Sequence, residues 1–212
     1  MKHAVLTDFD GTVTRTDVAE DILEAFAPRE WWAIEEEHRS RKIGTREAMV
    51  RQFALVHATR ARMLRFVDAN VQLDETFPAF VAYCQTRGMP LEIVSEGLDF
   101  YLRHLLDKWR ISVPVRTNRT AFERGKVVIS YPYADPTCNL CGTCKLHRLF
   151  ELRTQGYRIA YIGDGHSDLC PAIEADVVFA KKELADLCRE EEIDFIPFHT
   201  FADIQREIEQ WP

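Results

Sequence analysis

From about residue 75 onward, short apolar runs alternate with longer segments that have helical spacing. The expected strands, with one more near the N-terminus, are 4–9, 91–95, 112–115, 126–131, 157–162, 177–179 and 195–196. The expected helices in this part are 77–87, 98–109, 145–155, 182–191 and 201–210. Strands and helices that alternate in this way form a parallel sheet covered by helices on both faces. We therefore expect an α/β fold with a Rossmann-like sheet, in which 126–131 forms a hairpin that turns near Arg124 and Gly125.

Residues 16–74 interrupt this alternation, because they contain helical segments and no strand pattern. Asp17 and Glu20 have the spacing of a capping box at a helix start, and Pro28 ends that helix. We interpret this block as a helical cap inserted after the first strand. The predicted domains are a core of residues 1–15 and 75–212 and a cap of residues 16–74.

Composition limits the partners of the protein. The net charge is −7 and the pI is about 5.5, which argues against nucleic acid or an anionic membrane as a partner. No apolar run approaches the roughly 20 residues of a membrane span, and the strand expected from Ala4 leaves no room for a signal peptide. We therefore expect a cytosolic protein with free thiols at its six cysteines. The sequence leaves monomer and homodimer open.

Polar residues follow the first two expected strands of the parallel sheet. Asp8 and Asp10 end the first strand, and Gly11 allows a turn whose N–H groups can face an anion. Ser95 and Gly97 end the second strand and offer a hydroxyl and an amide to a phosphate oxygen. Ligand sites of open α/β sheets lie at this edge, so these groups are expected to meet. The alternatives are solvated turn acids for the Asp pair and a helix N-cap for Ser95.

Two further features complete the pattern. Lys145 begins a helix, where a cation is disfavoured by the helix dipole unless an anion binds nearby. Asp164 and Asp168 lie in a glycine-containing loop after a strand, and carboxylates at this spacing suit a hard cation. Taken singly, the lysine could be an exposed surface residue and Asp168 a helix cap. The order of all four features along the chain favours one site.

The chain resembles the haloacid dehalogenase superfamily and, within it, the phosphoserine-phosphatase-like branch, whose cap lies between the first and second motifs. The matching residues are Asp8-Phe9-Asp10-Gly11-Thr12, Ser95, Lys145 and Gly163-Asp164-Gly165-His166-Ser167-Asp168. The resemblance implies a phosphomonoesterase that uses Mg²⁺ and an aspartyl-phosphate intermediate.

The resemblance also implies a role for each matching residue. The nucleophile is Asp8, and Asp10 is the general acid and base. Mg²⁺ is held by Asp8, the Asp10 carbonyl and Asp164, and Asp168 supports the metal or the lysine. The groups expected to bind phosphate are Gly11, Thr12, Ser95, Gly97 and Lys145.

Closer similarity points to substrates. Phe26–Trp31, Cys141–Lys145 and Phe179–Leu184 resemble the methionine-salvage phosphatases that act on 2-hydroxy-3-keto-5-methylthiopentenyl-1-phosphate. Tyr161–Gly165 and Asp168–Pro171 also resemble vertebrate phosphoethanolamine/phosphocholine phosphatases. Phosphoserine is a further alternative.

Two positions depart from the phosphoserine pattern. Asp17 stands where that branch reads the serine amine with Glu, and Glu96 precedes Gly97 where the branch has two glycines. Asp17, Glu96 and His166 are the expected substrate contacts. A catalytically idle binding protein is disfavoured, because no acid or lysine of the four motifs is missing.

Cys138, Cys141, Cys144 and His147 are spaced by three residues each. Sulfur and imidazole at short spacing suit structural zinc, with free loop thiols as the alternative. We state a zinc site here as a hypothesis separate from the phosphatase motifs.

Overall fold

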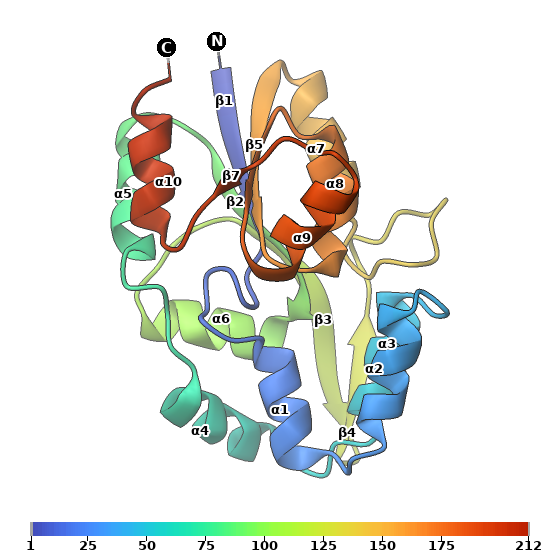
Figure 1. The fold of residues 1–212 in the computed structure, drawn as a ribbon. Helices are drawn as coiled ribbons and strands as arrows, with labels where there is room; N and C mark the ends of the chain where they lie inside the picture. The colour runs from blue at the N-terminus through green and yellow to red at the C-terminus, as the bar shows by residue number, and fades with distance from the viewer. Residues whose placement is uncertain (1, 212) are drawn as a thin grey trace.

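Seven strands form one sheet in the order β4-β3-β2-β1-β5-β6-β7 in the computed structural model, which describes residues 2–211 (Figure 1). The strands are β1 Lys2–Thr7, β2 Leu91–Leu98, β3 Val115–Glu123, β4 Lys126–Ser130, β5 Tyr157–Gly163, β6 Val177–Ala180 and β7 Ile196–Pro197. Neighbours pair in parallel except β3 and β4, which are antiparallel. The predicted α/β class is therefore confirmed. Because β1 lies between β2 and β5, the ends of the strands that carry three of the four motifs are adjacent.

Helices cover both faces of the sheet. The helices are α1 Val18–Phe26, α2 Trp31–Arg39, α3 Thr45–Phe53, α4 Arg60–Asn70, α5 Phe77–Thr86, α6 Asp99–Lys108, α7 Lys145–Thr154, α8 Leu169–Glu174, α9 Lys182–Glu190 and α10 Phe201–Ile208, with the short helix η1 at His166–Asp168. None of them, within residues 2–211, combines the length and the apolar character needed to cross a bilayer.

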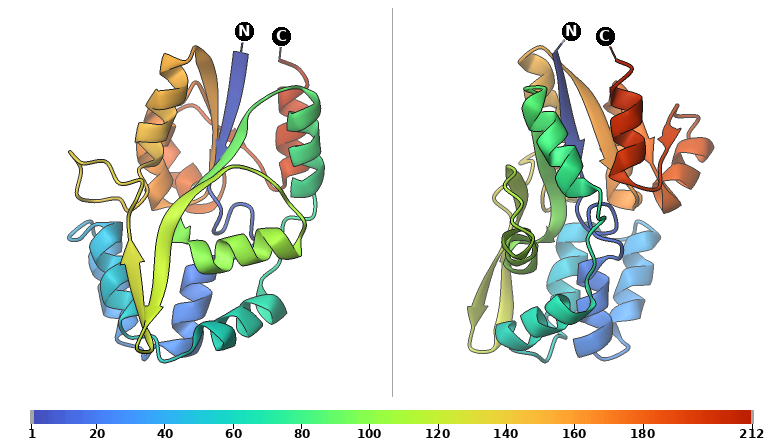
Figure 2. Two further views of the ribbon diagram at one scale, coloured as in Figure 1. Left: turned by 180° about the vertical axis from the view of Figure 1, so that it is seen from behind. Right: turned by 90° about the vertical axis from the view of Figure 1, so that its left-hand side faces the viewer.

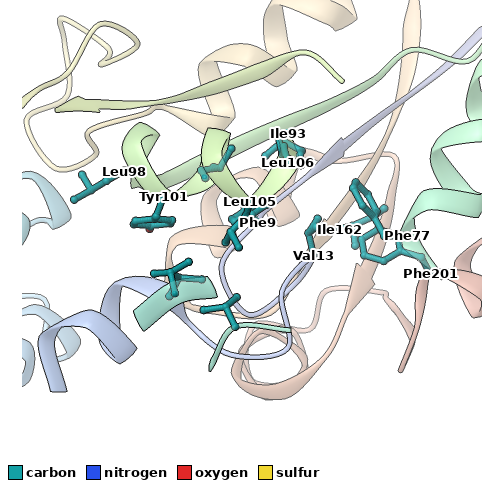
Figure 3. Packing of buried hydrophobic residues seen from close by; sticks show 14 of the residues in the cluster. Phe9, Val13, Phe77, Ile93, Leu98, Tyr101, Leu105, Leu106, Ile162 and Phe201 are labelled. Atoms are coloured by element: carbon teal, nitrogen blue, oxygen red, sulfur yellow. The ribbon is translucent and has the colours of Figure 1, made fainter. Parts of the chain in front are cut away.

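Alternate residues of the central strands pack into two separate apolar layers. Val5 and Ile162 pack with α5, α6 and α10, where Phe77 and Phe201 meet at a ring distance of 4.7 Å (Figure 3). On the other face, Leu6 packs against α7 in a second cluster. Burial on both faces explains why these strands have near-continuous apolar sequences. The same burial holds the strand ends in a fixed position under the site.

The segment from α1 to α4 lies beyond the C-terminal ends of the strands (Figures 1 and 2). Asp17 caps α1 by accepting a hydrogen bond from the Glu20 amide at 2.9 Å, and the helix ends just before Pro28. Trp31 begins α2, is 2% exposed and stacks on Trp32. Within this segment, between Val18 and Asn70, the structure contains helices and no named strand.

The β3–β4 hairpin differs from the expected strand at 112–115. β3 begins at Val115 and continues for nine residues, and β4 returns after a turn at Arg124 and Gly125, both of which have positive φ. The expected turn is confirmed, but the expected strand ends where the real one begins. The outer half of β3 alternates between exposed and partly buried residues, so it lacks the apolar run that marks a buried strand. The hairpin reaches past the sheet and lies beside α3 (Figure 2).

Candidate active site

A buried lysine joins two aspartates at the C-terminal edge of the sheet. Asp8 follows β1, Lys145 is the first residue of α7, and Asp168 ends η1. The Lys145 ammonium donates hydrogen bonds to Asp8 Oδ1 at 2.9 Å, Asp168 Oδ1 at 2.6 Å and Ser167 Oγ at 2.8 Å. The lysine is only 3% exposed, so its charge depends on these carboxylates for stabilisation. Their proximity removes the conflict between a lysine and the positive end of α7.

The turn after β1 requires glycine at position 11. Gly11 has φ +76°, and an added Cβ would lie 2.2 Å from Asp164 Oδ2. Its N–H group donates to Thr14 Oγ1 and to the Thr16 carbonyl, and the Thr12 hydroxyl donates to Asp164 Oδ1 at 2.7 Å. That Gly11 and Thr12 also bind phosphate stays a prediction. The turn itself uses these donors, and both residues act by holding the loop and Asp164 in place.

The Asp10 carboxylate points away from the lysine, toward a tyrosine that sequence reasoning missed. Asp10 Oδ2 accepts a hydrogen bond from the Tyr101 hydroxyl at 2.9 Å and from Ser95 Oγ at 3.3 Å. The Gly97 amide donates to Ser95 Oγ at 2.9 Å. A Cβ at Gly97 would lie 2.2 Å from Asp10 Oδ2, so only glycine fits there. The predicted residues Ser95 and Gly97 thus lie directly against Asp10.

Burial raises the pKa of Asp10 well above its usual range, and the nearby charges of Asp17 and Asp8 raise it further. Burial likewise raises the pKa of Asp8, with Lys145 opposing the rise. An aspartic acid that keeps its proton at higher pH than usual is suited to general acid catalysis. The two aspartates differ in their partners, since the ammonium lies on Asp8 and the phenol on Asp10.

Three carboxylates form a group that can hold a cation. Asp8, Asp164 and Asp168 each offer an oxygen, and these oxygens lie within 4.8 Å of one another. A donor set made only of oxygen suits a hard divalent ion. Asp168 Oδ2 also accepts hydrogen bonds from the amides of Asp164 and Gly165, so this residue fixes the loop as well as Lys145. The Asp10 side chain points toward Tyr101 and Ser95, so its backbone carbonyl is the group that it can offer to a cation.

A cavity of about 330 Å³ lies above these carboxylates, between the strand ends and the helical segment. The core contributes Asp8, Asp10, Ser95, Glu96, Gly97, Asp164, Gly165, His166, Ser167, Lys182 and Glu183. The helices α1 to α3 and the residues next to them contribute Asp17, Ala19, Glu20, Leu23, Glu35, His38, Arg39, Thr45, Ala48, Met49 and Gln52. The cavity therefore has a floor of mainly polar groups, several of them carboxylates, and a roof of mixed polarity.

All three residues expected to contact substrate line this cavity. Glu96 is 8% exposed, His166 is paired with Glu183 at 2.7 Å, and Asp17 caps α1. Lys182 was not expected from the sequence. It donates to Asp164 Oδ2 at 2.9 Å and adopts φ 48°, which no pattern in the sequence indicates. Neighbouring residues along the chain do not reveal such a contact.

Asp17→Asn is expected to stabilise the protein more at pH 8 than at pH 5. Burial raises the pKa of Asp17 to about 7, and the Glu20 charge adds to the rise. The folded state thus binds the Asp17 proton more tightly than the unfolded chain does. The contribution of Asp17 to the free energy of unfolding is therefore fully present below pH 4 and is lost as the pH rises toward 7. Asparagine removes the charge and still caps the helix.

The measurement is the free energy of unfolding in urea at the two pH values. We expect the gain at pH 8 to exceed that at pH 5 by on the order of 1 kcal/mol. The control is Glu24→Gln on the exposed side of the same helix. An equal change at both pH values for Asp17→Asn would contradict the assignment.

The cysteine loop does not support the zinc hypothesis. Within residues 2–211, the group of three or more metal-binding side chains that lie close together is the aspartate trio, without the cysteines and His147. His147 instead contacts Asp135 at 3.1 Å, and Cys144 caps α7 by accepting from the His147 amide. The regular spacing by three residues thus does not bring the four side chains to one point.

The sheet topology and the site define an α/β protein in which the end of a central parallel strand presents a carboxylate to a buried ammonium. More narrowly, the chain belongs to the putative phosphatase family, which matches residues 3–206. The protein is thus a phosphatase, and a divalent metal is implied by its class and its acidic cluster.

Curated relatives are similar over nearly the whole chain. Proteins from Geobacillus thermodenitrificans and Brevibacillus brevis are each 35% identical, over 93% and 99% of this chain and 91% and 96% of their own. Both are named 2-hydroxy-3-keto-5-methylthiopentenyl-1-phosphate phosphatase.

Two solved structures share the fold. A phospho-aspartyl intermediate analogue of phosphoserine phosphatase has a TM-score of 0.75 and 17% identity, covering 97% of this chain and 98% of that one. A HAD family hydrolase from Salmonella enterica has a TM-score of 0.78 and 19% identity, covering 99% and 72%. At these identities the likeness concerns the fold.

Proposed function

We propose that the protein hydrolyses 2-hydroxy-3-keto-5-methylthiopentenyl-1-phosphate with Mg²⁺ in the cytosol. The observation that carries the catalytic part is the pairing of Asp8 with a buried Lys145, beside an Asp10 whose pKa is raised by burial. The substrate is supported by the names of relatives that are 30–35% identical over nearly the whole chain. The cytosolic location is supported by six free cysteines, which suit a reducing compartment.

The proposed reaction has two steps. Asp8 attacks phosphorus, the bond to the ester oxygen breaks, and Asp10 gives its proton to that oxygen. A water molecule then gives a proton to Asp10 and attacks the same phosphorus, which releases inorganic phosphate and restores the Asp8 carboxylate. The Tyr101 hydroxyl holds Asp10 in position during both proton transfers.

Charge on the phosphoryl oxygens is balanced by groups already in the site. Ser95, Ser167 and Lys145 are the proposed donors to these oxygens, because their polar atoms converge on Asp8 and Asp10. Mg²⁺, when bound by Asp8, Asp164 and the Asp10 carbonyl, supplies further positive charge for the same oxygens.

We further propose that residues 16–74 form a cap on a core of residues 1–15 and 75–212. The proposal is supported by helices α1 to α3, which contribute the roof of the cavity. Leu23, Ala48 and Met49 give this roof an apolar part that suits a methylthio group. A cap of this kind excludes water and selects the leaving group.

The test is a comparison of kcat/KM for the proposed substrate, phosphoserine and phosphoethanolamine. The two amines are included because Asp17 lines the cavity and a carboxylate can pair with an ammonium. The proposed substrate is expected to be preferred over both amines by at least about a hundredfold, since each mismatched group costs a few kcal/mol. A higher kcat/KM for either amine would reject the substrate and leave the phosphatase assignment intact.

Chelation is expected to abolish activity, and added Mg²⁺ is expected to restore it. Three carboxylates within 4.8 Å repel one another, so a divalent cation should also stabilise the folded protein. Both p-nitrophenyl phosphate hydrolysis and the melting temperature are measured in EDTA and after return of Mg²⁺ or Ca²⁺. Full turnover in excess EDTA would reject the metal role. Ca²⁺ is expected to raise the melting temperature with little turnover, because its coordination is larger and looser.

A further inference from the structure

Glu96 presents a buried carboxylate oxygen that no group in the described chain satisfies. Its Oε2 accepts a hydrogen bond from the Gly142 amide at 3.0 Å. Its Oε1 has no hydrogen-bond partner within residues 2–211, although the residue is 8% exposed and lines the cavity. The Cys141 thiol is a neighbour of the same carboxyl group but makes no hydrogen bond to Oε1. Buried carboxylate oxygens are normally hydrogen-bonded, so this atom is ready for a donor from a ligand.

The loop that carries the cysteines holds Glu96 in place. Asn118 Nδ2 donates to the Glu96 carbonyl at 2.5 Å, and Thr143 Oγ1 donates to Asn118 Oδ1 at 3.0 Å. A Cβ on Gly142 would lie 2.5 Å from Asn118 Oδ1 and 2.6 Å from Tyr131, so the close approach of this loop requires glycine. Hydrogen bonds to the Glu96 carbonyl and to Oε2 thus hold the residue in place. The other carboxylate oxygen, Oε1, is therefore preorganised for binding.

The position of Glu96 identifies the part of a substrate that it can reach. Its chain neighbour Ser95 contacts Asp10, the proposed proton donor to the ester oxygen. Glu96 lines the same cavity as Ser95 and Asp10, so a leaving group that takes its proton from Asp10 would lie within this cavity beside Glu96. On the cap side, His38 lines the same cavity, and hydrogen bonding to Glu35 raises the pKa of His38 with a smaller contribution from the Glu96 charge. Burial raises the pKa of Glu96, and the Lys145 charge opposes the rise.

We propose that Glu96 is a specificity-determining residue whose Oε1 accepts a hydrogen bond from a hydroxyl group beside the phosphorylated carbon of the substrate. The Lys145 ammonium already offsets part of the Glu96 charge, so a neutral donor completes the site without a second cation. The inference rests on the proposed phosphatase function and adds the chemistry of the leaving group. In the proposed substrate, the 2-hydroxy group is next to the 1-phosphate and supplies such a donor. A glycine at this position, as in the phosphoserine branch, cannot make this contact.

The test uses a pair of esters that differ in one hydroxyl group. 2-Hydroxypropyl phosphate has a hydroxyl on the carbon next to the ester, and propyl phosphate has none. The ratio of their kcat/KM values is measured for the wild type, Glu96→Ala and the control Glu183→Ala, another carboxylate that lines the cavity. Where turnover is slow, the ratio is taken from inhibition constants against p-nitrophenyl phosphate. Because the ratio is taken within each variant, a general loss of activity cancels.

The ratio in the wild type is expected to favour 2-hydroxypropyl phosphate and to fall about tenfold or more in Glu96→Ala, while Glu183→Ala retains it. An unchanged ratio in Glu96→Ala would overturn the proposal. Glu96→Gln keeps the shape of the side chain, so it tests the proposal if the alanine variant does not fold. An amide also hydrogen-bonds a hydroxyl, and this variant is expected to keep most of the preference.

Phosphoethanolamine provides the third ester. If Glu96→Gln and Glu96→Ala lower the preference for phosphoethanolamine over propyl phosphate and leave the 2-hydroxypropyl ratio at its wild-type value, Glu96 binds an ammonium and the hydroxyl proposal is overturned. Failure of the wild type to hydrolyse the methionine-salvage ester would reject the proposed substrate without affecting the ester ratios. The two proposals therefore fail separately.

Discussion

Asp8→Asn is expected to lower kcat for p-nitrophenyl phosphate by at least about a thousandfold while the protein stays folded. An amide cannot form the acyl phosphate, and it is a poor ligand for a divalent cation. The fold should persist because Asn has the same shape and Lys145 keeps its hydrogen bond to Asp168. Burial raises the pKa of Asp8, so a charge that is costly to bury is removed.

Phosphate release and thermal unfolding are measured in saturating Mg²⁺. The matched control is Asp107→Asn, an exposed aspartate on α6. Acid-quenched wild-type protein should carry one phosphoryl group on the peptide that contains Asp8, and the variant should carry none. Near-normal turnover by a folded Asp8→Asn protein would refute the nucleophile assignment.

Lys145→Met is expected to affect both activity and stability. The ammonium is buried between Asp8 and Asp168, and removal of one partner from a buried ion cluster typically costs about 3–5 kcal/mol. Turnover should fall by at least about a hundredfold, because the variant loses a donor to the phosphoryl oxygens. Methionine has a similar length, so the loss reflects charge more than volume.

Urea unfolding at pH 7 and pH 4 distinguishes charge from packing. Asp8 binds a proton more readily without the lysine, whose charge lowers the pKa of Asp8, so the loss of stability should be smaller at pH 4. The surface substitution Lys126→Met is the control. A second control is Lys145→Met combined with Asp168→Asn, which should recover part of the stability because one buried charge is removed. Equal stability of Lys145→Met and the wild type at pH 7 would contradict this view of the cluster.

The parts of the fold that sequence reasoning predicted are those with local signals. β1, β2 and β5 are buried on both faces, so their sequences are apolar runs that end at polar motifs. The start of α1 could be predicted because Asp17 has the sequence spacing of a helix cap. The outer half of β3 was not visible, because its partner β4 and the neighbouring helix α3, more than its own composition, stabilise it.

The site shows the same division. The residues at a strand end or a helix start, such as Asp8 and Lys145, could be predicted from motif order. Tyr101 could not be predicted in this way, because its contact with Asp10 joins positions 91 residues apart. A tyrosine within a helix is normally interpreted as part of the hydrophobic core. Gly11 shows why motif order does not give every contact. A sharp turn and an anion site require the same N–H donors, and in the folded loop the Gly11 amide donates to Thr14 Oγ1.

The strand order has a consequence for the nascent chain. β1 is synthesised first, but one of its two neighbours is β5, which leaves the ribosome only after most of the protein has been made. Until then the nucleophile lies on an open sheet edge, and the loop with Asp164 and Asp168 does not yet exist. A ribosome-stalled fragment that ends before Tyr157 should therefore be unable to turn over phosphate esters. Activity should appear only after β5 and the loop that follows it have folded onto β1.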